Sequence, residues 1–130
     1  MKLLTDNNYN KNIMEKDITR PFIIFFESKS CPHCKTVKTI LTRFEKDKEK
    51  PCDVDIYEVM SNDSPKLTKL YGLRSFPTTF FFCTDKNVKF TIIGAQGLDE
   101  FVKGYRKLCS GSADKDKKES TSWIKKIFGK

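Results

Sequence analysis

The sequence predicts an α/β fold in which helices cover both faces of a central mixed β-sheet. A continuous apolar run at residues 22–26 has the length of a strand that is buried on both faces. The segment that follows, from residue 31 to about 48, carries apolar residues at helical spacing. Two later apolar segments, 78–83 and 88–92, are so close in sequence that they must pair as an antiparallel hairpin.

The chain has the size and composition of one globular domain. It has 130 residues, of which 38% are hydrophobic, and this is enough for one core. No stretch approaches the roughly 20 apolar residues of a membrane span. Residues 1–6 lose their apolar character after two leucines, unlike a secretory signal. We therefore expect a cytoplasmic protein without a signal peptide or a transmembrane segment.

The first half of the chain predicts a helix, a strand, a longer helix and a second strand. Residues 8–17 have helical spacing and stop before Pro21, which disfavours a helix in the residue ahead of it. After the strand at 22–26, the longer helix has a predicted buried stripe of Val37, Ile40, Leu41 and Phe44. The second strand is predicted at 53–59, joined to the first by a right-handed crossover.

The second half predicts a short helix, the hairpin and a last helix. Ser64 is the expected N-cap of the short helix and Gly72 its C-terminal stop, while Leu67 and Leu70 are expected to be buried. A turn at 85–87 joins the two hairpin strands. The last helix is marked by its apolar positions, which are Leu98, Phe101, Val102, Tyr105 and Leu108.

The chain changes character at its C-terminal end. We expect a folded domain at 1–109 and a basic, flexible tail at 110–130, because residues 110–120 are rich in Gly, Ser, Asp and Lys. A short amphipathic helix at 121–130 needs a surface to fold on, and a membrane surface, a partner groove and its own domain are the three candidates. The net charge of +8 favours acidic partners or a peripheral membrane association. No basic-aromatic motif of a nucleic-acid-binding protein is present, so no nucleic acid is expected.

Two of the five cysteines are placed for redox chemistry. Cys31 and Cys34 are three positions apart where a strand gives way to a helix, so both lie in the first helical turn. There, unpaired backbone N–H groups and the positive end of the helix dipole favour a thiolate. Pro32 suits this turn because its missing N–H is not needed there. The three remaining thiols are expected to be buried and inert, with a regulatory role as the alternative, and they are Cys52, Cys83 and Cys109.

These features resemble the thioredoxin superfamily. The resemblance rests on the CxxC at Cys31–Cys34, on residues 70–78, and on Ile93–Ala95 before the last helix. It implies a thioredoxin-like three-layer fold and a thiol-disulfide oxidoreductase that acts on protein substrates with thiols or disulfides. It also implies a cis peptide bond at Pro77, and a peptide-binding edge formed by Phe76 and Pro77.

The resemblance assigns a role to each residue of the CxxC motif. Cys31 would attack a substrate disulfide, and Cys34 would resolve the mixed disulfide. Pro32 and His33 form a Pro-His dipeptide similar to that of the periplasmic disulfide-oxidant branch. A cationic His33 would stabilise the Cys31 thiolate and make the pair a better oxidant. Because the Cys31–Cys34 disulfide is itself the redox group, we expect no cofactor and no metal, and we expect a monomer.

Two positions depart from the family pattern. Many members carry a buried acid six residues before the first cysteine, where this chain has Phe25. Glu27, on the same strand face, is either a substitute for that acid or an exposed residue at the strand end. Ser30 stands where thioredoxins usually have tryptophan. Neither departure removes the dithiol chemistry.

Other functions stay open on the residues alone. One is a non-catalytic thioredoxin-fold binding or structural module recruited through its basic amphipathic tail. Another is a metal site at Cys31, His33 and Cys34, but a closed zinc site needs about four ligands, and neighbours on one helical turn do not converge on one ion. The direction of electron transfer is also open. The Pro-His dipeptide favours an oxidant or isomerase, whereas a cytosolic setting favours a reductase.

Overall fold

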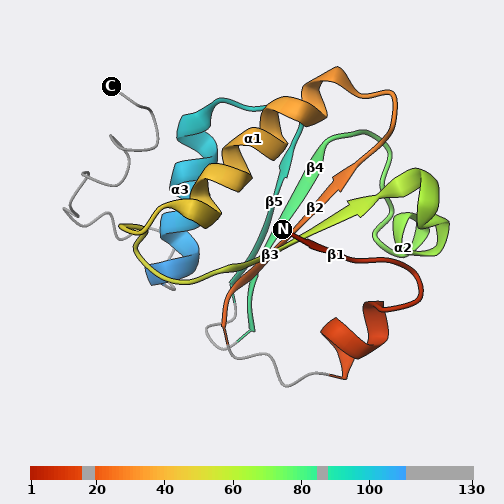
Figure 1. The fold of residues 1–130 in the computed structure, drawn as a ribbon, viewed down its shortest axis with the longest axis horizontal. Coiled ribbons are helices and arrows are strands. Elements are labelled where there is room, and N and C mark those ends of the chain that lie inside the picture. Colours follow the sequence, from red (N-terminus) through yellow and green to blue (C-terminus); the bar gives the residue numbers. More distant parts are fainter. Residues whose placement is uncertain (16–19, 85–87, 111–130) are drawn as a thin grey trace.

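A five-stranded mixed sheet forms the centre of the computed structural model, which describes residues 1–15, 20–84 and 88–110 (Figure 1). Its strands are β1 (Lys2–Leu3), β2 (Phe22–Glu27), β3 (Asp55–Met60), β4 (Thr78–Cys83) and β5 (Val88–Ile93), in the order β1-β3-β2-β4-β5. β3 runs parallel to both β1 and β2, β4 antiparallel to β2, and β5 antiparallel to β4. The predicted mixed sheet is confirmed, and β1 is an edge strand that the sequence pattern did not predict.

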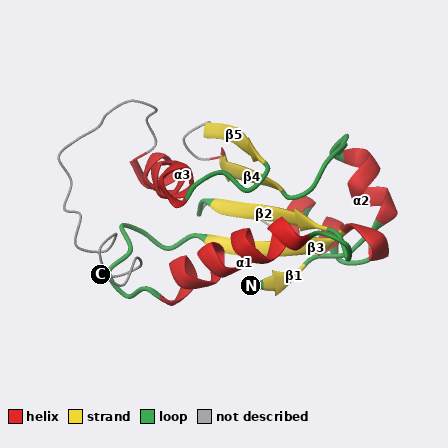
Figure 2. Ribbon diagram, turned by 90° about the horizontal axis from the view of Figure 1, so that it is seen from above, coloured by secondary structure: helices red, strands yellow, loops and turns green. Residues whose placement is uncertain are grey.

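The helical elements of the described residues are η1 (Asn10–Met14), α1 (Pro32–Lys46), η2 (Ser61–Asp63), α2 (Pro65–Leu70) and α3 (Leu98–Ser110). α1 and α3 cover one face of the sheet (Figure 1). α2 lies at the end toward which the arrows of β2 and β3 point (Figure 2). The carboxyl ends of β2 and β3, the start of α1 and α2 therefore share one end of the molecule.

β2 is buried along its whole length, as predicted, and it separates two apolar cores. Successive side chains of a strand point to opposite faces. Ile23 and Phe25 thus join the core beneath α1 and α3, which includes the predicted stripe of α1. The alternate side chains face a second core with Leu4 and Leu67. The central position of β2 also positions Cys31 and Cys34, because the segment that follows β2 leads into the start of α1.

The N-terminal segment holds α2 in place. The Asp6 carboxylate accepts hydrogen bonds from the backbone N–H groups of Lys66 (3.1 Å) and Leu67 (2.8 Å), in the first turn of α2. The Tyr9 and Tyr71 hydroxyls lie 2.8 Å apart, just beyond the end of the same helix. Asp6 thus performs the capping that α2 requires.

One expectation for α2 is wrong, and it concerns Leu70. Ser64 is the N-cap residue, as predicted, but its side chain makes no capping hydrogen bond, and the Asp6 carboxylate accepts from the first N–H groups instead. Leu70 is 65% exposed, whereas Leu67 is buried as expected. A helix of six residues presents little more than one turn to the sheet, and its last side chain lies beyond that contact. The predicted C-terminal stop is confirmed, since Gly72 has a φ of 62° that favours glycine.

A disulfide joins Cys52 to Cys109, with their Cα atoms 5.7 Å apart. The expectation of inert free thiols is therefore wrong for these two residues, whereas Cys83 is free and buried as expected. The loop between α1 and β3 passes beneath the end of α3 (yellow and blue in Figure 1), which brings the two cysteines together. The Tyr105 hydroxyl of α3 donates a 2.8 Å hydrogen bond to the Cys52 carbonyl and holds the loop there.

Several expectations fall on residues that the structure does not describe. The tail with its helix at 121–130 and the turn at 85–87 lie outside the described residues. The first predicted helix, 8–17, is present only as η1, and residues 16 and 17 also lie outside. Within the described residues, we find no helix with the length and apolar character needed to cross a membrane.

Candidate active site

Cys31 and Cys34 lie at the start of α1 and are joined by a disulfide, with their Cα atoms 5.3 Å apart. Cys31 is the N-cap residue in an extended conformation, and Pro32 is the first helical residue. The Cys34 N–H donates a 3.1 Å hydrogen bond to the Cys31 carbonyl. Cys34 is only 2% exposed, whereas Cys31 is half-buried. Cys31 is therefore the cysteine that a second protein can reach.

The electrostatic setting of the first turn favours a thiolate at Cys31. The turn contains no acidic residue, and the N–H groups at the helix N-terminus point toward the cysteines. His33 is exposed beside the disulfide, and the exposed Lys29 and Lys35 flank the motif. A thiolate at Cys31 would thus lie at the positive end of the helix dipole with no acidic residue in the same turn, which lowers its free energy.

Phe76 and Pro77 lie at the same end of the sheet as the cysteine pair. The register of β2 and β4 pairs Phe26 with Thr78, so Pro77 lies beside the point where β2 ends and the chain turns toward Cys31. The Phe76–Pro77 peptide bond is cis, the isomer that the resemblance implied. Phe76 is half-buried and Pro77 buried. Phe76 and Cys31 both pack against the core beneath α1.

Ile93 and Gly94 lie at this end of the sheet as well. The Gly94 N–H donates a 2.8 Å hydrogen bond to the Pro77 carbonyl, and Gly94 has a φ of 86°. Ile93 pairs with Thr78 across the β4–β5 hairpin, and its side chain is 61% exposed. Sequence reasoning used this segment only as a landmark. Its position shows an apolar side chain available for contact next to the cis-proline loop.

Glu27 is buried at the end of β2, only 7% exposed, and this decides between its two predicted environments. Burial and hydrogen bonding with Glu58 raise the pKa of Glu27, the charge of Lys38 lowers it, and together these effects bring the pKa to about 7. A carboxyl with this pKa exchanges a proton near neutral pH. Phe25, at the position of the family's buried acid, is instead part of the core.

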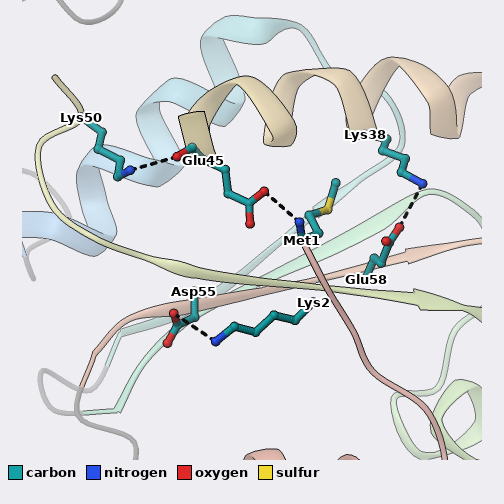
Figure 3. Close-up of polar contacts among 7 residues, drawn as sticks. All are labelled: Met1, Lys2, Lys38, Glu45, Lys50, Asp55 and Glu58. Carbon is teal, nitrogen blue, oxygen red and sulfur yellow. Dashed lines mark hydrogen bonds and ion pairs between the residues drawn. The ribbon is translucent and has the colours of Figure 1, made fainter. Parts of the chain in front are cut away.

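Lys38 links α1 to this acid and to a second carboxylate. Its ammonium lies 3.1 Å from a Glu58 oxygen and 4.0 Å from a Glu27 oxygen (Figure 3 shows the Glu58 contact). Lys38 is four residues after Cys34, so both lie on one face of α1. The sequence could therefore have placed Lys38 near the cysteine pair, because this spacing is visible within one helix. Glu58 was not predictable in this way, because it approaches only through the parallel pairing of β3 with β2.

The cysteine sulfurs bond to one another rather than converge with other ligands. Among residues 1–15, 20–84 and 88–110, no group of three or more His, Cys, Asp or Glu side chains is arranged to hold a metal ion. The arrangement instead offers a disulfide at the start of α1, an apolar segment at the same end of the sheet, and a titratable carboxyl at the end of β2.

Comparison with known proteins agrees with this geometry. The family model described as Thioredoxin matches residues 1–107. A thioredoxin of Rickettsia felis is 30% identical over 93 residues, which are 72% of this chain and 84% of the relative. A thioredoxin of Porphyra purpurea is 25% identical over 92 residues, 71% of this chain and 81% of the relative. The crystal structure of chloroplastic thioredoxin z superposes with a TM-score of 0.71 at 12% identity, covering 85% of this chain and 95% of that one.

Proposed function

The chain belongs to the thioredoxin family and is a thiol-disulfide oxidoreductase, and on this premise we propose that Cys31 is its nucleophile and Cys34 its resolving cysteine. The observation that carries the proposal is the unequal exposure of the two sulfur-bearing residues at one helix start. Cys31 is half-buried and sits at the N-cap, whereas Cys34 is 2% exposed one turn further in. A second protein therefore meets Cys31 first.

The proposed reaction is a two-step exchange. The Cys31 thiolate attacks one sulfur of a substrate disulfide, a Cys31–substrate disulfide forms, and the other substrate sulfur leaves as a thiolate. The Cys34 thiolate then attacks the Cys31 sulfur and releases the second substrate sulfur. The substrate gains two electrons and the enzyme ends with the Cys31–Cys34 disulfide. The reverse sequence oxidises a substrate dithiol.

We assign substrate binding to Phe76, Pro77 and Ile93. Phe76 and Ile93 present partly or largely exposed apolar surface, and Pro77 holds the loop at the sheet edge near Cys31. Among the described residues, no backbone group hydrogen-bonds to the Phe76 N–H or carbonyl. These groups are free to pair with an extended segment of a protein substrate.

We assign to Glu27 the exchange of the Cys34 proton with solvent. Cys34 must lose its proton to attack, and it is buried, where a thiolate is disfavoured. Glu27 is the titratable group at the end of β2 whose pKa is raised to about 7, and Lys38 joins it to the helix face that carries Cys34. The sequence left this role open for Glu27, as a substitute for the buried acid of the family.

We propose that the chain oxidises or isomerises substrates, with His33 as the residue that tunes the pair. His33 is exposed on the first turn beside the Cys31–Cys34 disulfide. A positive charge there stabilises the thiolate, and thereby the reduced form. The second disulfide supports this direction, because disulfides persist mainly in oxidising compartments. It argues against the cytoplasmic location expected from the sequence. The monomeric state, the domain limits 1–109 and a tail that binds lipid or a partner stay predictions.

Cysteine substitutions test the proposal directly. Cys31→Ser is expected to abolish the exchange with a disulfide-containing protein substrate. Cys34→Ser should instead accumulate a covalent complex with that substrate, visible on a non-reducing gel and released by dithiothreitol. Cys83→Ser, which alters the one free cysteine of the described residues, serves as the control for thiol number. Exchange that survives Cys31→Ser would overturn the assignment.

A further inference from the structure

The two disulfides lie at opposite ends of the sheet. Cys31 follows the carboxyl end of β2, whereas Cys52 precedes the amino end of β3, which runs parallel to β2. Figure 1 shows the α1–β3 loop and the end of α3 at the end of the molecule away from α2. A substrate bound at Phe76 and Pro77 therefore does not reach Cys52 and Cys109. The second disulfide is outside the exchange reaction on grounds of position alone.

The helix dipoles act on the two pairs in opposite senses. Cys31 and Cys34 sit at the N-terminus of α1, where the dipole favours a thiolate. Cys109 is in the last turn of α3, which ends at Ser110, and there the dipole disfavours a thiolate. A dithiol whose thiolates are destabilised has a more stable disulfide.

Acidic side chains add to this effect around Cys52. The Tyr105 hydroxyl lies 2.8 Å from the Cys52 carbonyl, so the charges that act on Tyr105 also act close to Cys52. Burial raises the pKa of Tyr105, and the negative charges of Asp53 and Asp47 raise it further. Asp47 is 8% exposed, and one of its carboxylate oxygens has no hydrogen-bond partner among the described residues. A thiolate at Cys52 would meet the same negative charges.

Two cations at this end, Lys50 and Lys107, have other partners. The Lys50 ammonium donates a 3.0 Å hydrogen bond to the Glu45 carbonyl, as Figure 3 shows. The Lys107 ammonium lies 4.7 Å from the centre of the Phe90 ring. Because both ammonium groups are engaged in these contacts, we do not expect them to stabilise a thiolate. Position, dipole and acidic neighbours thus act together on Cys52 and Cys109.

We propose that Cys52–Cys109 is a structural disulfide, which stays closed while Cys31–Cys34 opens and closes during turnover. It forms when the two thiols transfer two electrons and two protons to a disulfide such as oxidised glutathione, which leaves as two molecules of glutathione. It closes a loop, between cysteines 57 positions apart, that includes β3, α2, β4, β5 and most of α3. Its role is to hold the end of α3 on the α1–β3 loop.

The first test compares the two pairs in one sample of the full 130-residue chain. The oxidised protein is equilibrated with increasing ratios of reduced to oxidised dithiothreitol, the thiols are alkylated, and mass spectrometry of peptides reports each pair separately. We expect Cys52–Cys109 to need a ratio at least about 100-fold higher than Cys31–Cys34. Reduction of both pairs within about threefold of the same ratio, or Cys52 and Cys109 opening first, would overturn the proposal.

The second test removes the disulfide and measures stability. The paired variants Cys52→Ser/Cys109→Ser and Cys52→Ala/Cys109→Ala are expected to lower the Tm of the oxidised protein by about 10–20 °C. Both should leave the equilibrium of Cys31–Cys34 with glutathione unchanged. A Tm equal to that of wild type in both variants would contradict a structural role. A shifted Cys31–Cys34 equilibrium would show that the pairs are coupled, and that also contradicts the proposal.

The proposal goes beyond exchange at the CxxC motif and can be judged without it. Cys31→Ser/Cys34→Ser is expected to keep the Cys52–Cys109 disulfide and its resistance to reduction. If the chain showed no disulfide exchange at Cys31 and Cys34, the resistance of Cys52–Cys109 to reduction could still be measured and would still test the proposal.

Discussion

The ammonium of Lys38 on α1 lies 3.1 Å from a carboxylate oxygen of Glu58 on β3. This contact places a cation of the active-site helix over the acidic end of the sheet, where Glu27 is also within 4.0 Å of it. Burial and the hydrogen bond with Glu58 raise the pKa of Glu27 to about 7, although the Lys38 ammonium opposes them.

Glu27→Gln is expected to change how stability depends on pH. The folded protein holds the Glu27 proton more tightly than the unfolded chain, because the pKa is raised from 4.5 to about 7. This contribution to stability is full below the unfolded value and is lost as the pH rises through about 7. Wild type should therefore lose about 1–3 kcal/mol more than Glu27→Gln between pH 4.5 and 8. Urea unfolding of the oxidised proteins measures it.

The control for this prediction is Glu15→Gln, since Glu15 is exposed. It should follow the pH dependence of wild type. Equal pH dependence of wild type and Glu27→Gln would show that Glu27 keeps an ordinary carboxyl pKa.

His33→Pro is expected to make the Cys31–Cys34 pair less oxidising. Loss of the imidazole beside the disulfide removes its stabilisation of the thiolate, so the glutathione equilibrium should shift by about tenfold or more toward the disulfide. The measurement is the fraction of alkylated cysteine in glutathione buffers of graded ratio. His33→Gln, which removes the imidazole without the backbone restriction of proline, should shift the equilibrium in the same direction. Unchanged equilibria in both variants would reduce His33 to a solvent-facing residue.

Gly104→Ala is expected to destabilise the fold although alanine is the better helix former. A Cβ at residue 104 would lie 3.0 Å from the Phe81 ring and 3.1 Å from the Phe90 ring. Phe81 is fully buried and stacked on Phe90, with ring centres 4.6 Å apart, so it has no space to move. We expect a net loss of about 0.5–2 kcal/mol in denaturant unfolding. Gly97→Ala, with no atom within 4 Å of its added Cβ, should lose much less.

Asp6→Ala is expected to loosen α2. It removes two hydrogen bonds to the first turn of that helix, at 2.8 and 3.1 Å, and should cost about 1 kcal/mol. Hydrogen exchange of the Lys66 and Leu67 amides should accelerate more than that of α3. Asp63→Ala is a matched control, because it removes only an exposed 3.7 Å ion pair with Lys29. Equal effects of the two substitutions would deny Asp6 its capping role.

Periodicity predicted the elements whose signal lies within one segment. The buried stripe of α1 and the strand at 78–83 are found where the apolar spacing placed them. The cysteine pair and Pro77 were readable for the same reason, since each belongs to a short contiguous motif. Local sequence therefore predicted the main strands, the longer helices and the positions of the cysteine pair and Pro77.

The features that sequence reasoning missed depend on contacts between distant segments. Asp6 caps a helix about 60 residues away, as its hydrogen bonds to Lys66 and Leu67 show. Cys52 and Cys109 are 57 positions apart, and three cysteines outside the CxxC allowed several pairings. The burial of Glu27 follows from the sheet register and from the side chain of Lys38. No local pattern encodes these distances.

The loop closed by Cys52 and Cys109 has a consequence for fragments of the chain. Cys31 and Cys34 lie outside this loop, in the preceding part of the sequence. A protease that nicks the backbone once between residues 52 and 109 leaves both pieces covalently joined. A nick between Cys34 and Cys52 instead separates the reactive motif from the rest. Limited digestion on paired non-reducing and reducing gels would thus reveal which side of Cys52 opens first when the protein begins to unfold.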